Sequence, residues 1–290
     1  GNASLGSGDF NGDGLADVVA VTSTVQVHLS RRAGGFDAAA PIQNVCCGQF
    51  AVADVDRDGL PDVVLHAQSQ FQVMRSLGDG TFSAGATVNI QDSRALDPPI
   101  FADVVGSSAL DAIIFDDSSL QSRIVVIPAV AGIPITISMP RRVRSVAAGD
   151  IDSDGRADLI VTMDTATQTG DEIVVLKSDG IGGFTTHQSI EPQQGIGPVL
   201  ALDLTGDGRT DLISGDLYWL FVNSGGQLSL PVATGGVAGG RFIATSQSFD
   251  FNRDGKADFL LRGDGDSIHV ALGAGDGTFS GSSTGVSGEI

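Results

Sequence analysis

Residues 54–62 read DVDRDGLPD, and closely related nine-residue segments recur five more times along the chain. Successive copies begin 45 to 53 residues apart, so six repeats of about 48 residues account for the 290-residue chain. A period of this length indicates an architecture in which neighbouring repeats share a hydrophobic core. The other copies are DFNGDGLAD at 9–17, DVVGSSALD at 103–111, DIDSDGRAD at 150–158, DLTGDGRTD at 203–211 and DFNRDGKAD at 250–258.

Each repeat contains four short segments that are typical of β-strands. A run of small and apolar residues precedes the motif, as in Phe50 to Ala53, and a β-branched or apolar run follows it, as at 63–65. A third apolar run and a glycine turn, such as GDGTF at 78–82, lead into a less regular fourth segment. This pattern predicts an all-β fold, a β-propeller of six four-stranded blades. We place the blades at approximately 1–44, 45–93, 94–141, 142–194, 195–241 and 242–290, within one domain.

The composition also favours strands and turns over helices. Of the 35 acidic residues only Glu172, Glu191 and Glu289 are glutamates, and only two residues are lysines. A helical protein would use Glu and Lys on its surface, because both keep rotamer freedom in a helix. Asp and the 40 glycines are instead typical of turns. The alternative arrangement of the same strands is an array of β-sandwiches or a solenoid.

The repeated motif, DxDxDGxxD, has the ligand pattern of a calcium loop. Side-chain oxygens recur at positions 1, 3, 5 and 9, glycine at position 6 permits a sharp turn, and position 7 can offer its carbonyl. The motif is not an EF-hand, because position 12 is never Glu and a strand follows. The alternative is that Asp and Gly only cap tight hairpins. The candidate calcium ligands are Asp9, Asn11, Asp13, Leu15, Asp17, Asp54, Asp56, Asp58, Leu60, Asp62, Asp150, Asp152, Asp154, Arg156, Asp158, Asp203, Thr205, Asp207, Arg209, Asp211, Asp250, Asn252, Asp254, Lys256 and Asp258.

The six copies differ at the ligand positions. The second and fourth carry four carboxylates each, whereas the first and sixth have Asn11 and Asn252 at position 3. The fifth has Thr205 there, which is a poorer ligand. We therefore expect about five Ca²⁺ ions and an empty third repeat. That repeat keeps Asp103 and Asp111 but has Val105, Ser107 and Ser108 where ligands and glycine are expected.

The net charge of -19 is mainly explained by these loops. The five intact copies hold about half of the acidic residues, and five Ca²⁺ would bring the formal charge to -9. A surface this acidic repels phosphate groups, so we expect no nucleic-acid binding and no binding to anionic membranes. No apolar run approaches the ~20 residues that a membrane span needs. No signal-peptide pattern is visible, and we expect a monomeric domain.

The alternation of DxDxDGxxD, an apolar strand and a GDGTF turn resembles the FG-GAP/VCBS repeat family over essentially the whole chain. That family includes the propeller of integrin α subunits and many bacterial secreted or surface proteins. The resemblance implies calcium in the loops between the first and second strands of each blade. It also implies an extracellular or cell-surface location and a role in adhesion or ligand binding. Integrin propellers have seven blades of longer repeat, so integrin ligand binding is not carried over.

Two local features are candidate ligand contacts. Cys46 and Cys47 are the only cysteines and are adjacent. A vicinal disulfide would be strained, because neighbouring Cα atoms lie 3.80 Å apart whereas ordinary disulfides span 4.4–6.8 Å. Two thiols or a purely structural turn are the alternatives. The basic cluster Arg141, Arg142 and Arg144 could clamp a carboxylate or sulfate, such as that of an acidic sugar, or could be a solvated loop.

The sequence thus favours a calcium-stabilised extracellular propeller that binds a glycan or a protein. The competing class is an enzyme, such as a propeller lyase or dehydratase. No clustered set of acid, base or redox-metal residues supports catalysis, so we expect no enzymatic activity. A third possibility is a purely structural domain within a larger surface protein.

Overall fold

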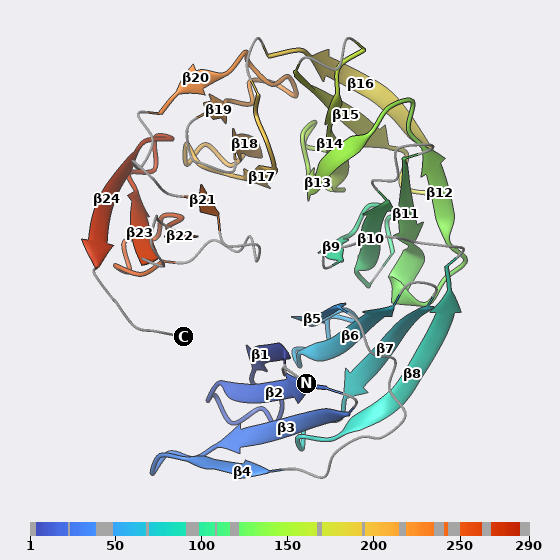
Figure 1. The fold of residues 1–290 in the computed structure, drawn as a ribbon, viewed down its shortest axis with the longest axis vertical. Coiled ribbons are helices and arrows are strands. Elements are labelled where there is room, and N and C mark those ends of the chain that lie inside the picture. Colours follow the sequence, from blue (N-terminus) through green and yellow to red (C-terminus); the bar gives the residue numbers. More distant parts are fainter. Residues whose placement is uncertain are drawn as a thin grey trace. The chain divides into compact units, whose positions relative to one another are not determined.

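The computed structural model describes residues 4–22, 24–38, 49–67, 70–90, 99–107, 109–116, 122–166, 170–192, 195–214, 219–234, 241–242, 250–262 and 268–284. Within these ranges, 24 strands form six four-stranded antiparallel sheets (Figure 1). Each sheet takes four strands in sequence order, so every connection joins neighbouring strands. These sheets are the blades of a β-propeller, and the predicted fold class is confirmed. We number the blades 1 to 6 along the chain.

The chain divides into two compact units, of which the first holds blades 1 to 3. It comprises Gly1–Pro140 with Gly180–Gly182. A single 3-10 turn, η1 (Pro128–Val130), interrupts the strands of blade 3. The strands are β1 (Ser4–Gly8), β2 (Asp17–Val21), β3 (Val25–Ser30) and β4 (Phe36–Ala38) in blade 1, β5 (Gln49–Ala53), β6 (Asp62–Ala67), β7 (Gln70–Ser76) and β8 (Phe82–Asn89) in blade 2, and β9 (Ile100–Ala102), β10 (Asp111–Asp116), β11 (Arg123–Ile127) and β12 (Ile135–Ser138) in blade 3.

The second unit, Arg141–Asp179 with Gly183–Ile290, holds blades 4 to 6. Its sixth blade begins at Arg241, the last residue of the predicted fifth blade. The strands are β13 (Val143–Gly149), β14 (Asp158–Asp164), β15 (Asp171–Ser178) and β16 (Phe184–Ile190) in blade 4, β17 (Val199–Leu202), β18 (Asp211–Ser214), β19 (Trp219–Phe221) and β20 (Val232–Ala233) in blade 5, and β21 (Arg241–Phe242), β22 (Phe259–Arg262), β23 (Ile268–Gly273) and β24 (Phe279–Thr284) in blade 6.

In blades 2 to 5 the second strand carries consecutive apolar residues that are buried on both faces of the sheet. In β6, Val63 and Leu65 pack in a core shared with blade 1, whereas Val64 packs in a core shared with blade 3. Successive side chains of a strand point to opposite faces, so a continuous apolar run supplies both cores. In the second unit, Leu212 of β18 packs in the core shared by blades 4 and 5. Its neighbour Ile213 packs in the core shared by blades 5 and 6.

The described residues contain no helix that is long and apolar enough to cross a membrane. The sheets instead position the loop that joins the first two strands of each blade. In blades 1 to 5 this loop coincides with the repeated nine-residue motif, because the motif ends at the first residue of the second strand, and in blade 6 the motif ends one residue before β22.

Candidate calcium loops

We call the six motif segments loops 1 to 6, in chain order, and number the positions of each loop from 1 to 9. The Asp at position 1 organises its own loop by accepting two main-chain hydrogen bonds. One carboxylate oxygen accepts the N–H of position 5 in all six loops, at 3.0–3.2 Å. The other accepts the N–H of the glycine at position 6 in the five intact loops, at 2.8–3.0 Å. The turn is thus formed by the chain's own polar groups.

The backbone of each loop takes the left-handed conformation at position 4. Glycine occupies this position in loops 1, 3 and 5, as Gly12, Gly106 and Gly206 with φ of 68–74°. Loops 2, 4 and 6 place Arg57, Ser153 and Arg253 there, with φ of 59–62°. Loop 3 shares this geometry although it lacks most of the ligands. Its backbone path therefore does not depend on acidic side chains at positions 3 and 5, whereas Asp103 and Asp111 remain in place.

The Asp at position 9 is buried and connects three segments of its blade. One oxygen accepts the N–H of position 2 of the same loop, at 2.8–3.2 Å in all six loops. The other accepts an N–H at the end of the third strand, at 2.7–3.0 Å. These carboxylates are at most 1% exposed. They are Asp17, Asp62, Asp111, Asp158, Asp211 and Asp258.

Burial alters the protonation of the position-9 carboxylates in the two most acidic loops. It raises the pKa of Asp62 to about 6, although the N–H groups of Ser76 and Val55 act in the opposite direction. Burial raises the pKa of Asp158 in the same way. A bound cation would counteract this effect, since an opposite charge nearby favours the ionised carboxylate.

Loops 2 and 4 each bring three of their predicted carboxylate ligands close together. The ligand oxygens of Asp54, Asp56 and Asp58 all lie within 4.8 Å of one another. The same holds for the set formed by positions 1, 3 and 9 of loop 4, which is Asp150, Asp152 and Asp158. Among the described His, Cys, Asp and Glu residues, these are the groups of three that meet this criterion. The donor set is all oxygen, which is what Ca²⁺ prefers.

One carboxylate oxygen in each of these two loops is left without a partner. Oδ1 of Asp56 and Oδ1 of Asp152 are buried and accept no hydrogen bond. An unsatisfied buried oxygen is costly in a folded protein, and a cation would remove that cost. The residues of loops 2 and 4 therefore fit a calcium ion.

Loops 1, 5 and 6 arrange their position-3 side chains differently. Oδ1 of Asn11 and of Asn252 each accept the N–H of position 5, at 3.1 Å. The hydroxyl of Thr205 instead donates to Oδ2 of Asp211, at 3.0 Å. The two amide oxygens thus lie beside the loop's own carboxylates, and Thr205 is engaged with position 9.

In the intact loops, position 7 has its N–H bonded to a carboxylate oxygen of position 5, at 2.8–3.0 Å. The side chains of Arg156 and Arg209 also pair with the position-5 carboxylate, at 2.8 and 3.0 Å. The residues at position 7 are Leu15, Leu60, Arg156, Arg209 and Lys256. That their carbonyls bind calcium stays a prediction.

Position 2 connects a loop to the next blade within the same unit. Its side chain is buried in loops 1 to 5, as in Phe10 and Val55, both fully buried. Its carbonyl accepts a hydrogen bond from the following blade, for example from the N–H of Gly80 to Phe10 at 3.1 Å. The equivalent bonds go to Val55 from Leu110, to Ile151 from the Asn223 amide and to Leu204 from Gly277. Ordering of a loop is therefore coupled to the packing of adjacent blades.

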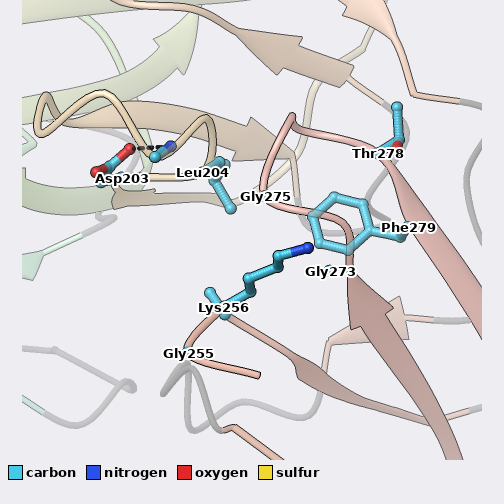
Figure 2. A pocket seen from close by; sticks show the side chains of 10 residues that line it. Asp203, Leu204, Gly255, Lys256, Gly273, Gly275, Thr278 and Phe279 are labelled. Carbon is cyan, nitrogen blue, oxygen red and sulfur yellow. Dashed lines mark hydrogen bonds between the residues drawn. The ribbon is translucent and has the colours of Figure 1, made fainter. Parts of the chain in front are cut away.

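A pocket of about 110 Å³ lies between loops 5 and 6 in the second unit (Figure 2). Figure 2 shows the Lys256 side chain extended along this pocket toward Gly275 and Phe279. Blade 6 has Ala257 and Gly273 where blade 2 has the larger Pro61 and Ser76, which helps to explain the space. The pocket is lined by Asp203, Leu204, Gly206, Gly255, Lys256, Ala257, Gly273, Gly275, Thr278 and Phe279.

Two further groups of ligand contacts were predicted outside the loops, namely the cysteine pair and the arginine cluster. Cys46 and Cys47 lie outside the described residues. Arg141 forms an ion pair with Glu172, which is largely buried, and Arg144 pairs with Asp164 through its Nε at 2.6 Å. The carbonyl of Arg142 accepts the Asp164 N–H at 2.9 Å. These contacts connect the basic cluster to the C-terminal end of β14 and the N-terminal end of β15.

Sequence reasoning missed two basic residues at the candidate calcium loops. Arg75 forms an ion pair with Oδ2 of Asp56, and Lys177 forms one with Oδ2 of Asp152. The Asp152 carboxylate raises the pKa of the Lys177 ammonium through this hydrogen bond. Both residues lie near the end of the third strand, 19 and 25 positions from their partners. A comparison of that strand position across the six repeats would have found them.

Similarity to known proteins supports the repeat assignment. The profile of the FG-GAP-like repeat matches residues 9–65 and 54–114, and that of the FG-GAP repeat matches residues 143–174. No curated protein is a significant match to the chain. The matched segments include loops 1 to 4, with loop 3 among them.

Two solved structures share the fold. One is a lectin from Agrocybe aegerita, described for its specific recognition of non-reducing terminal N-acetylglucosamine. It is 20% identical with a TM-score of 0.63, and the match covers 97% of this chain and 79% of the lectin. The other is BBS1N, solved in complex with ARL6DN, at 13% identity and a TM-score of 0.55, with 92% and 77% covered. The chain thus carries repeats of the FG-GAP family, built into the four-stranded blades of a β-propeller.

Proposed function

We propose that this protein is an extracellular calcium-binding propeller that acts as a carbohydrate-binding or adhesion module. The observation that carries the calcium part is the convergence of oxygens in loops 2 and 4. There the ligand atoms lie within 4.8 Å of one another, and a buried carboxylate oxygen lacks a partner. Loops 1, 5 and 6 share the main-chain turn and supply three carboxylates each. Loop 3 has Val105 and Ser107 at two ligand positions and is proposed to bind no ion.

Calcium in these loops would supply rigidity. The ion would be held by positions 1, 3, 5 and 9 and the carbonyl of position 7. Position 2 lies between the proposed ligands at positions 1 and 3. Its side chain and carbonyl contact the next blade. A loop fixed by calcium would therefore hold neighbouring blades in register and support the connections that display binding groups.

The carbohydrate part is supported by two weaker observations. A propeller of the same fold is described as a lectin for N-acetylglucosamine. The chain also carries Arg141, Arg142 and Arg144 at one connection, and arginine suits bidentate recognition of a carboxylate or sulfate. Arg144 keeps 46% of its side chain exposed beside Asp164. An acidic sugar is thus the ligand class that we propose, with Cys46 and Cys47 as further candidate contacts.

Two measurements test the proposal. Native mass spectrometry in calcium should find about five ions per chain, and Asp152→Ala should remove one of them. A glycan array probed with and without calcium should show calcium-dependent binding of acidic sugars. Arg142→Ala and Cys46→Ser/Cys47→Ser should weaken that binding while calcium content and folding stay unchanged. A chain that binds no calcium contradicts the first part, and a chain that binds calcium but no glycan contradicts the second.

A further inference from the structure

In each of the two most acidic loops the position-3 carboxylate is contacted by a basic residue from the third strand of the same blade. Lys177 Nζ contacts Oδ2 of Asp152 and lies 3.8 Å from Oδ2 of Asp154. In loop 2 the Arg75 guanidinium contacts Oδ2 of Asp56. Both basic side chains are less than two-fifths exposed, and the two carboxylates are 13% and 21% exposed. These contacts are therefore more sheltered than ordinary surface ion pairs.

The basic residue is present only where position 3 is an aspartate. Its place in the repeat is defined by the structure, because the next residue donates its N–H to the position-9 carboxylate. At this place the other four repeats have an apolar residue, and at position 3 they have no carboxylate. The pairs are Leu29 with Asn11, Pro128 with Val105, Val222 with Thr205 and Leu272 with Asn252.

This correspondence equalises the formal charge summed over positions 1, 3, 5 and 9 and the third-strand position of the five intact loops. Loops 1, 5 and 6 have carboxylates at positions 1, 5 and 9 and a neutral residue at position 3. Loops 2 and 4 have a fourth carboxylate, and Arg75 or Lys177 offsets it. The sum over these five positions is -3 in each intact loop, and loops 4, 5 and 6 each have one further basic residue at position 7, which is Arg156, Arg209 and Lys256.

The two oxygens of each paired carboxylate have different environments. Oδ2 of Asp56 and of Asp152 contacts the basic group, whereas Oδ1 is buried without a partner. The basic group thus fixes the carboxylate and leaves one oxygen for a metal. A fixed positive charge at this place also repels a divalent cation.

We propose that Arg75 and Lys177 are built-in cations that weaken calcium binding at loops 2 and 4 and bring it close to that of loops 1 and 6. The inference rests on the proposed calcium function and assigns these residues a role in setting affinity. The calcium concentration at which loops 2 and 4 fill is then determined by residues of the third strand as well as by the motif.

The test follows calcium binding loop by loop in the full chain. The position-6 glycine amides bond to the position-1 carboxylate, so their NMR signals report on single loops. Titration with Ca²⁺ should show Gly155 of loop 4 responding at about five- to tenfold lower concentration in Lys177→Met, as expected on removal of one nearby positive charge. Arg75→Met should shift Gly59 of loop 2 in the same direction and serves as an independent second variant.

A double variant and a matched control complete the design. Asp152→Asn/Lys177→Leu gives loop 4 the residues that loops 1 and 6 have at position 3 and at the third-strand position, and its affinity should then match that measured at Gly255. Arg31→Met removes a cation that pairs with Asp37 outside the loops and should change none of the titrations. If Lys177→Met and Arg75→Met leave affinity unchanged or weaken it, the inference is wrong although the calcium proposal stands. If no glycine signal of the wild type responds to calcium, both are wrong.

Discussion

At the scale of single residues, the described core contains one titratable side chain without a partner. His66 on β6 is 2% exposed, and neither ring nitrogen forms a hydrogen bond. It lies across from Phe71, with ring centroids 6.3 Å apart. Burial lowers the pKa of His66, because the charged imidazolium would lose its water. His66 is therefore a packing residue in its neutral form.

This environment predicts an acid-sensitive contribution to stability. The folded pKa lies below the unfolded value of ~6.5, so the unfolded chain binds the proton more readily. The free energy of unfolding should fall as the pH drops below 6.5, by at most about 1.4 kcal/mol per pH unit from this residue. His66→Phe should remove that slope.

Urea denaturation between pH 7.5 and 5.5 measures the difference between the wild type and His66→Phe. The raised pKa of Asp62 acts in both proteins and cancels from this difference. A difference that does not change with pH would contradict the assignment of a buried neutral imidazole.

At the scale of the element, each intact loop combines two roles, which are the structural connection of its blade and the calcium binding that we propose. The motif alone does not separate these roles. The position-9 carboxylate joins position 2 to the third strand in all six blades, including blade 3. Asp111 receives N–H groups from Val104, Val105 and Ala129, at 2.8–2.9 Å. This explains why blade 3 retains an aspartate at position 9 although its other ligands are missing. Position 3, by contrast, makes no such contact with the backbone in loops 2 and 4.

The two roles should separate on mutation. Asp111→Ala leaves buried N–H groups without acceptors and should lower the free energy of unfolding by about 3 kcal/mol. That loss should be the same in calcium and in chelator. Asp152→Ala should cost little in chelator but remove the contribution of one ion in calcium. Chemical denaturation of both variants under the two conditions measures this, and a calcium-dependent loss for Asp111→Ala would contradict the structural role.

At the scale of the whole molecule, the repeats make stability a sum of similar contributions. Each pair of neighbouring blades within a unit shares a core, and the loops contribute the position-2 side chains to these cores. Ligands that bind only the folded state add to its stability in proportion to the number of sites. Calcium bound in several loops would therefore act on the entire chain.

Chelation should consequently lower the melting temperature. Sites with Kd ~0.1 mM in ~1 mM calcium would each stabilise by about 1.4 kcal/mol. Five such sites would add about 7 kcal/mol, comparable to the ~5–15 kcal/mol margin of a domain, and their loss would lower Tm by about 15–25 °C. Differential scanning calorimetry in calcium and in excess chelator measures this. Magnesium should not restore the loss, because it demands a more rigid octahedral shell. A Tm that is unchanged by chelation would contradict the calcium proposal.

The sequence by itself determined the features that depend on neighbouring residues. The period of the repeats, the four strands of each blade and the Asp–Gly turns are local patterns, and the six sheets confirm them. Contacts between distant residues were decided only by the tertiary structure. The Asp158 contact with Ser178 spans 20 positions and the Lys177 contact with Asp152 spans 25. The basic cluster was predicted either to contact a ligand or to be a solvated loop, and only the tertiary structure brings Arg141 to Glu172 on β15. Local turn chemistry is encoded within a few residues, whereas the partner of a charged side chain depends on which strands the sheet brings together.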